Sequence, residues 1–267
     1  MKELIVRGIS GVLYITIIVF AMFASREWYL VLFFILGLLT LNEFQKLVRL
    51  KSYLSFFIFA ILFYFLGYKV FDQNPISLYA ILAIFVNLFL LKDLLVTSKI
   101  PMFEKKKYIT VIFYIIAGFI FLALIPFRGG VFFPEIIIGI FVLIWVNDSF
   151  AYLIGKNFGK RKLLERISPK KTIEGFFGGF FATLIASFII SKYVTNLSLT
   201  YWIFLGLIVS VLGTFGDLIQ SKFKRQAGVK DSGVLMPGHG GIYDRLDSVL
   251  YVSPFIYSFL EIVDYVS

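Results

Sequence analysis

Long apolar runs, separated by short polar segments, fill most of this sequence. Most of the runs approach the roughly 20 residues that a helix needs to cross the hydrocarbon core of a bilayer. They therefore predict transmembrane helices. We expect about nine, over residues 8–24, 28–47, 54–68, 76–91, 109–127, 132–154, 176–190, 201–219 and 249–263.

The composition indicates that these helices make up nearly the whole molecule. Of the 267 residues, 60% are hydrophobic, and the mean hydropathy is +0.91. Soluble domains contain about 45–50% apolar residues even when glycine is counted. We predict an all-α polytopic membrane protein with one continuous membrane domain, in which residues 1–127 form a hydrophobic scaffold and residues 128–267 carry the site. A signal peptide is the alternative for the first run, but no small-x-small cleavage site follows it.

The basic residues are distributed unevenly among the polar segments. The net charge is +10, and with the N-terminus inside, 22 of the 26 lysines and arginines fall on cytoplasmic segments. This matches the bias of membrane proteins towards positive cytoplasmic loops. It predicts that segments 156–171 and 221–247 face the cytoplasm. An anionic substrate is a second explanation for the charge, and it is compatible with the first.

Polar residues inside the apolar runs differ between the two halves. Asn87 is a lone amide of the kind that makes helix–helix hydrogen bonds. Asp148 lies in an otherwise apolar run and shares a helical face with Tyr152. An acid at membrane depth is a functional-site candidate, and an interhelical hydrogen bond is the alternative. Asp217 shares a face with Ser221 in the same way.

The stretch 221–247 is too polar to lie beside hydrocarbon. Its segment 237–241 (Pro-Gly-His-Gly-Gly) cannot form a regular helix, and its glycines let backbone N–H groups approach a ligand. Asp244 and Asp247 follow, three residues apart and on one face of a helix. An ordinary helix start, where acids interact favourably with the helix dipole, is the alternative explanation for this pair.

Any metal in this protein should be held by carboxylates. The chain has no cysteine and one histidine, which excludes disulfides, thiolate catalysis and a His-rich zinc site. Carboxylate ligands favour a hard cation such as Mg²⁺.

A second basic segment indicates an anion site. Ser168 and Pro169 match an N-cap followed by proline at the first helical position. Lys170 and Lys171 would then lie beside the free N–H groups of a helix N-terminus, which is an arrangement that binds anions. A positively charged cytoplasmic loop is the alternative.

Acids that hold metal and cations that hold phosphates recur together in phosphoryl and nucleotidyl transfer. The chain lacks a Gly-x-x-x-x-Gly-Lys-Ser/Thr motif, so a P-loop ATPase is not expected. The rival from another class is an ion or solute transporter, with Asp148 and Asp217 on the ion path. The position of these acids near helix ends disfavours it.

The polar stretch also resembles the signature of the phosphatidate cytidylyltransferases, or CDP-diacylglycerol synthases. The resemblance covers about residues 145–254, and the first half of the chain matches only in being hydrophobic. The matching positions are Ser221, Lys224, Arg225, Lys230, Asp231, Gly233, Pro237, Gly238, His239, Gly240, Gly241, Asp244, Arg245 and Asp247.

The resemblance implies a reaction of CTP with phosphatidic acid that gives CDP-diacylglycerol and pyrophosphate. It implies Mg²⁺ dependence, with K⁺ as a further candidate cation, and a homodimer in contact with membrane lipids in a bacterial inner membrane, with no nucleic acid as partner. A CTP-dependent enzyme that acts on another lipid phosphate or alcohol is the nearer alternative.

Three groups of site residues are expected. The catalytic group is Lys222, Lys224, Arg225, Lys230, Asp231, His239 and Arg245. The group that binds substrate phosphate is Ser168, Lys170, Lys171, Thr172, Ser221, Gly238, Gly240 and Gly241. The metal ligands are Asp148, Asp217, Asp244 and Asp247.

Overall fold

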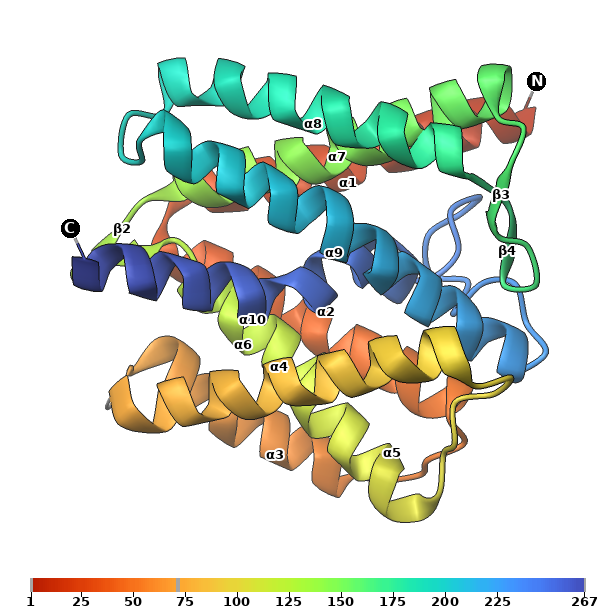
Figure 1. Ribbon diagram of the computed structural model, residues 1–267. Helices are drawn as coiled ribbons and strands as arrows, with labels where there is room; N and C mark the ends of the chain where they lie inside the picture. Colours follow the sequence, from red (N-terminus) through yellow and green to blue (C-terminus); the bar gives the residue numbers. More distant parts are fainter. Residues whose placement is uncertain (1, 71–72, 267) are drawn as a thin grey trace.

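A computed structural model describes residues 2–70 and 73–266 as a bundle of long helices that run roughly side by side (Figure 1). The two ends of the chain lie at opposite ends of the bundle. The helical elements are α1 (Lys2–Ala24), α2 (Arg26–Leu47), α3 (Leu54–Leu62) with the π-helical η1 (Phe63–Tyr68), α4 (Gln73–Val96), α5 (Glu104–Thr110) with the π-helical η2 (Val111–Ile116), α6 (Ala117–Leu124), α7 (Pro134–Phe158), α8 (Ile173–Tyr193), α9 (Leu199–Gln226) and α10 (Tyr243–Val266).

Two short antiparallel hairpins complete the described chain. One pairs β1 (Phe127–Arg128) with β2 (Val131–Phe132), and the other pairs β3 (Lys162–Leu164) with β4 (Ser168–Thr172). The all-α class predicted from the sequence is confirmed, since these hairpins are small additions between helices.

Each predicted apolar run lies mostly in helical structure, although the runs 109–127 and 132–154 reach into strands β1 and β2, and nine transmembrane spans are not confirmed. Seven helical segments of the described chain are long and apolar enough to cross a membrane. Gly8–Ala24 and Leu54–Tyr68 are apolar helices of only 10–17 residues, which is short for the hydrocarbon core of a bilayer. The seven are Arg26–Leu47, Asn74–Val96, Glu104–Leu124, Pro134–Phe158, Ile173–Tyr193, Leu199–Gln226 and Tyr243–Tyr265.

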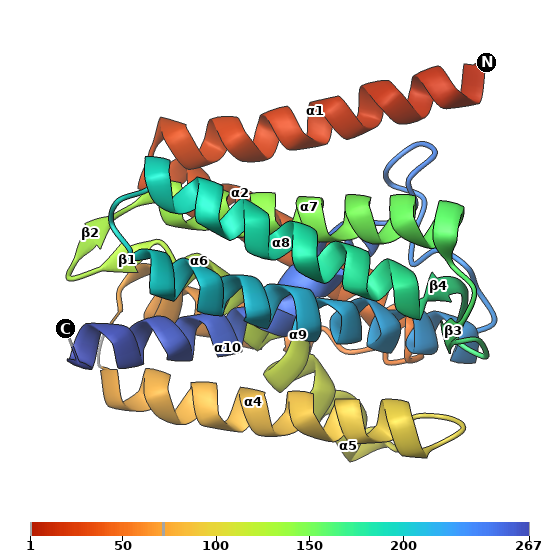
Figure 2. The same cartoon turned by 45° about the horizontal axis from the view of Figure 1, so that its top comes forward.

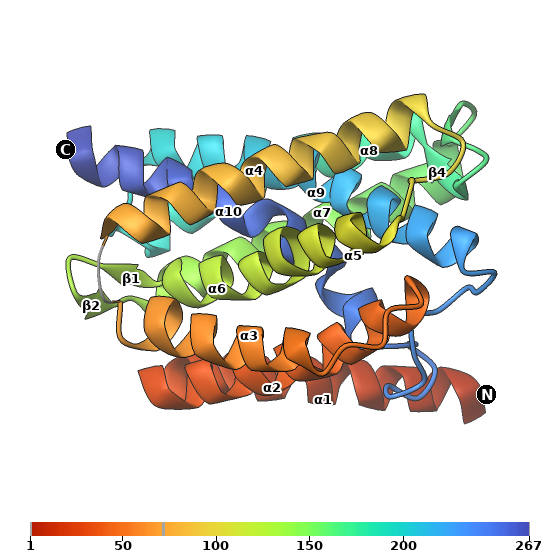
Figure 3. The same ribbon diagram turned by 90° about the horizontal axis from the view of Figure 1, so that it is seen from below.

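The middle of the bundle is α6, between α10 and α2 (Figure 3). All of its residues are buried. Beside it, the hydroxyls of Tyr114 and Tyr243 lie 2.9 Å apart, and the ring of Phe44 packs edge-on against both tyrosines. This aromatic cluster fixes the start of α10 against α2 and η2.

Hydrogen bonds to backbone groups join the two halves of the chain. Asn87 on α4 donates to the carbonyl of Tyr251 at 3.2 Å, and the Tyr251 hydroxyl donates to the carbonyl of Asn87 at 2.9 Å. The helix–helix role predicted for Asn87 is therefore confirmed. Lys222 is buried and donates to the carbonyls of Asp93 (2.5 Å), Leu94 (3.2 Å) and Thr97 (2.7 Å) at the end of α4.

The segment before α8 differs from its prediction. Ser168 is not an N-cap, because Ser168–Thr172 form strand β4 against β3. The side chain of Thr172 instead accepts from the backbone N–H of Gly175 at 3.1 Å, so the helix starts at Ile173. Pro169 is compatible with extended backbone, and pairing with β3 satisfies backbone hydrogen-bonding groups of the segment. The helix therefore begins four residues later than predicted, after the cap at Thr172.

Candidate active site

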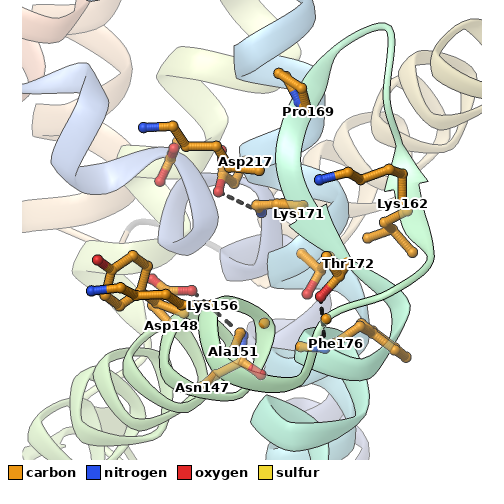
Figure 4. Close-up of a pocket in the computed structure, with 18 of the residues that line it drawn as sticks. Asn147, Asp148, Ala151, Lys156, Lys162, Pro169, Lys171, Thr172, Phe176 and Asp217 are labelled. Atoms are coloured by element: carbon orange, nitrogen blue, oxygen red, sulfur yellow. Dashed lines mark hydrogen bonds and ion pairs between the residues drawn. The ribbon is translucent and has the colours of Figure 1, made fainter.

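A cavity of about 770 Å³ opens where α7, the β3–β4 hairpin, α8, α9 and α10 meet. Figure 4 shows side chains from these elements pointing into it. Its polar and charged lining residues are Asn147, Asp148, Tyr152, Lys156, Lys162, Lys170, Lys171, Thr172, Thr214, Asp217, Lys224, Asp231, Asp244, Arg245 and Asp247.

Close helix packing brings these residues together. A Cβ at Gly175 would lie 2.6 Å from the carbonyl oxygen of Ala151, so glycine lets α8 approach α7. A Cβ at Gly216 would lie 2.6 Å from the Cβ of Tyr251, so glycine lets α9 approach α10. Small residues permit such contacts between membrane helices. Asp217 consequently lies beside the start of α10.

The central ion pair of the cavity joins Lys171 on β4 to Asp217 on α9. The Nζ of Lys171 lies 2.5 Å from Oδ2 of Asp217, as drawn in Figure 4. Burial lowers the pKa of Lys171, but the charges of Asp217, Asp148 and Asp247 and the hydrogen bond to Asp217 together outweigh this effect, and the pKa is raised above its ordinary value. Lys171 is therefore a lysine that stays cationic at neutral pH, about a quarter exposed to the cavity.

Three acids from three helices face the same space. Asp148 comes from α7, Asp217 from α9 and Asp247 from α10, and all three line the cavity. The charges of Asp217 and Asp148 both act on Asp247. Their oxygen donors are the kind that Mg²⁺ prefers. As arranged, no group of three or more His, Cys, Asp or Glu residues among the described residues could hold a metal ion.

Asp244 lines the cavity but its carboxylate already accepts several protein hydrogen bonds. Lys224 (2.7 Å) and Gln220 (3.0 Å) donate to Oδ1. The backbone N–H groups of Ser232 (2.8 Å) and Gly241 (2.9 Å) donate to Oδ2, as does the Ser232 hydroxyl (3.0 Å). These partners tie the loop 227–242 to α9 and α10, so Asp244 has less free capacity for a metal than the other three acids.

Several expected site residues lie outside the lining of this cavity. Lys222 binds the end of α4, as described above, and Arg225 donates to the carbonyl of Val229 at 3.1 Å. Ser221 donates to Asp217 at 3.2 Å from one helical turn away, as the shared face predicts. The remaining residues outside the lining are Ser168, Lys230, Gly238, His239, Gly240 and Gly241.

His239 lies at the tip of the loop 227–242, against α1. Figure 2 shows α1 along the outside of the bundle and the loop reaching towards it. The Nδ1 of His239 is 2.7 Å from the hydroxyl of Ser10, and the same hydroxyl donates to the carbonyl of Pro237 at 3.0 Å. The imidazole therefore has a partner on the scaffold in this arrangement.

Two residues with a place at the site had no role in the sequence interpretation. Thr214 lines the cavity three residues before Asp217, and this spacing on a helix could have indicated it. Glu43, at the end of α2, contacts the loop 227–242 although 189 residues separate it from Ser232. Such a distant pairing has no local signal in one sequence.

The match to a family model extends over residues 5–263. The chain belongs to the cytidylyltransferase family. Its similarity to the phosphatidate cytidylyltransferase of Bacillus subtilis (strain 168) is 36% identity over 264 residues, which is 96% of this chain and 97% of that protein.

Staphylococcal proteins with the same name match a shorter region. The phosphatidate cytidylyltransferases of Staphylococcus aureus (strain COL) and Staphylococcus epidermidis (strain ATCC 12228 / FDA PCI 1200) are 51% and 45% identical to the chain, respectively. Both matches cover 118 residues, which is 43% of this chain and 45% of each relative.

Proposed function

We propose that this protein transfers the cytidylyl group of CTP to phosphatidic acid and releases pyrophosphate, forming CDP-diacylglycerol. The observation that carries the proposal is the cavity at the ends of membrane helices, which is lined by lysines and an arginine from five elements together with five aspartates. The membership of the family and the full-length similarity to a protein named phosphatidate cytidylyltransferase support the same reaction.

The chemistry requires cations more than it requires a base. A phosphate oxygen of phosphatidic acid attacks the α-phosphorus of CTP, and the bond from that phosphorus to the bridging oxygen of pyrophosphate breaks. The attacking oxygen is already anionic, so the main obstacle is repulsion between two anionic substrates. Lys162, Lys170 and Arg245 line the cavity and can offset this charge, which is how such sites stabilise a transition state.

Lys171 would act at the centre of this arrangement. Its ammonium group is held against Asp217 and faces the cavity, so a substrate phosphate could take the place of one carboxylate oxygen. The raised pKa of Lys171 keeps the charge available through the neutral pH range. Charge-assisted contacts of this kind both orient phosphate and neutralise it.

Mg²⁺ fits the donor chemistry of the three acids. In the arrangement described, these acids do not form a ready metal site, so Asp148, Asp217 and Asp247 would have to draw closer together around the ion. The bound ion would then neutralise the phosphates of CTP and the leaving pyrophosphate. K⁺ is a second candidate ion for the same oxygen-rich cavity. Asp244 is the weaker candidate ligand because Lys224, Gln220 and the loop already occupy its oxygens.

The location of the reaction follows from its substrates. One substrate is dissolved in water and the other is a membrane lipid, so the cavity should lie at an interface. The excess of lysine and arginine on one side supports the cytoplasmic face of the membrane, and the similarity to a bacterial protein supports an inner membrane. The homodimer implied by the family resemblance remains part of the proposal.

The decisive test uses the purified full-length protein in lipid nanodiscs with radiolabelled CTP. With phosphatidic acid and Mg²⁺, we expect a lipid-linked cytidine nucleotide and an equal amount of pyrophosphate. Diacylglycerol and other lipid phosphates serve as competing acceptors. Label on another lipid alone would favour the alternative transferase, and no labelled lipid with any acceptor would contradict the proposed function.

The orientation can be tested separately because the chain has no cysteine. Val234 is almost fully exposed in the loop 227–242, so Val234→Cys gives one accessible thiol. It should react with a membrane-impermeant reagent in inverted vesicles and not in intact cells. Labelling in intact cells would overturn the cytoplasmic assignment.

A further inference from the structure

Glu43 is a buried acid in the largely apolar first half of the chain. Its residue is 7% exposed, near the end of α2. Its carboxylate accepts hydrogen bonds from the backbone N–H groups of Ile242 (3.1 Å) and Tyr243 (2.9 Å) and from the hydroxyl of Ser232 (3.1 Å). All three donors belong to the loop 227–242 or to the first residue of α10.

The position of these donors explains why an acid is tolerated there. Tyr243 is the first residue of α10, so Glu43 satisfies an N–H group that has no partner within that helix. The positive end of the helix dipole also favours a negative charge at this point. α2 therefore supplies a cap to α10 from a distant part of the chain, and the hydrogen bonds offset the cost of burying the carboxylate.

Two glycines of the loop fit around this carboxylate. A Cβ at Gly233 would lie 2.4 Å from Oε1 of Glu43, and a Cβ at Gly241 would lie 2.3 Å from Oε2. Real Cβ atoms do not approach so closely, and here the neighbour is a carboxylate held by three hydrogen bonds. At these two positions glycine leaves room for Glu43.

Ser232 connects Glu43 to the cavity. Its hydroxyl is 3.1 Å from Glu43 and 3.0 Å from Asp244, whose other oxygen accepts from Lys224 in the cavity wall. Both carboxylates thus hold the loop at Ser232 and at its end beside α10. Asp247 is one helical turn beyond Tyr243, so any shift in the start of α10 would move it.

We infer that Glu43 is a positioning residue, which ties α2 to the loop 227–242 and to the start of α10 and thereby fixes Lys224, Arg245 and Asp247 in the cavity. Its effect on catalysis rests on the proposed function, whereas its effect on the loop does not. The hydrophobic scaffold, through Glu43 on α2, would thus help to arrange the site.

The test combines a spectroscopic measurement with turnover in the full-length protein. A nitroxide attached to Val234→Cys reports the mobility of the loop, and Val234 lies outside the cavity lining. We expect Glu43→Gln to increase the mobility of the label and Glu43→Ala to increase it more. Turnover of CTP should fall by at least tenfold in Glu43→Ala, with the larger change in kcat rather than in KM, because catalytic groups are displaced while most substrate contacts remain.

Two further variants separate positioning from a general loss of stability. Glu104→Gln is the matched control, because Glu104 is an acid with a 73% exposed side chain on α5, and it should change neither mobility nor turnover. Gly233→Ala leaves Glu43 in the chain but forces it from its place, so it should loosen the loop in the same way as Glu43→Gln.

The outcomes distinguish this inference from the proposed function. Unchanged label mobility in folded Glu43→Gln and Gly233→Ala proteins would overturn the role of Glu43. So would increased mobility with unchanged kcat in a protein whose unaltered form transfers cytidylyl groups. If the unaltered protein transfers none, the proposed function fails, and the label measurement alone still decides whether Glu43 holds the loop.

Discussion

In residues 1–127, the buried side chains of Tyr29, Tyr79 and Asn87 bond to backbone groups of other helical segments, whereas in residues 128–267 several polar side chains face one another across a cavity. Tyr29, for example, donates to the carbonyl of Leu122 at 2.6 Å, and Asn87 is paired with Tyr251. Lys171 and Asp217 instead pair at an accessible surface. A group bonded to backbone is committed to the fold, while a group paired with another side chain can exchange its partner for a ligand.

Lys222 and Lys171 show that the half of the chain in which a residue lies does not decide which kind of partner it has. Both are lysines of the polar second half. The Lys222 residue is 2% exposed and bonded to three carbonyls at and just after the end of α4, whereas the Lys171 side chain is 28% exposed and opens on the cavity. By its contacts, Lys222 belongs with the scaffold.

The largest effect on activity is expected from Asp247→Asn. Asparagine keeps an oxygen that can accept from the backbone N–H of Ser248, as Asp247 does at 2.7 Å, but it removes the charge needed to hold Mg²⁺. Cytidylyl transfer should fall by about two orders of magnitude or more, with an unchanged melting temperature. Near-normal turnover and Mg²⁺ dependence would show that the metal lies elsewhere. Asp264→Asn, at the exposed far end of α10, is the control.

Lys171→Ala should have the next largest effect. It removes the central cation of the cavity, and loss of one contact to transition-state charge costs about 2–4 kcal/mol, or one order of magnitude or more in turnover. Lys105→Ala, an exposed lysine on α5, should leave turnover unchanged. Equal turnover in the two variants would mean that the charge of Lys171 contributes only to the orientation of the protein in the membrane.

Lys222→Met should affect stability more than chemistry. Methionine retains the apolar stem but leaves the carbonyls of Asp93, Leu94 and Thr97 without their donor, at a cost of about 1–3 kcal/mol. We expect a lower melting temperature and only a modest change in turnover per folded molecule. A stable protein without activity would instead assign Lys222 to catalysis.

The smallest effect is expected from His239→Ala. The imidazole contacts Ser10 on α1 and lies outside the cavity lining, so turnover should decrease slightly and KM for CTP should not change. Ser10→Ala removes the same contact from the other side and should reproduce the result. A large rise in KM in His239→Ala alone would indicate that the histidine reaches the nucleotide.

The sequence predicted the helical class and many of the residues that line the cavity because both depend on local signals. Apolar runs located the helices, and the acids and lysines of 145–247 marked the cavity. The β3–β4 hairpin was missed because Ser168 and Pro169 fit a helix start equally well. The roles of Lys222 and Asp244 could not be separated from those of Lys171 and Asp247, since residue type does not reveal which partner a side chain meets.

The paired hydrogen bonds between Asn87 and Tyr251 have a consequence for biosynthesis. Asn87 lies on α4 and Tyr251 on α10, which is synthesised 164 residues later. Until α10 arrives, α4 carries an amide whose native partner has not yet been made, at a depth where unsatisfied polar groups are costly. The scaffold therefore completes its own packing only when α10 joins it, and a chain that terminates before α10 leaves the Asn87 amide without this partner.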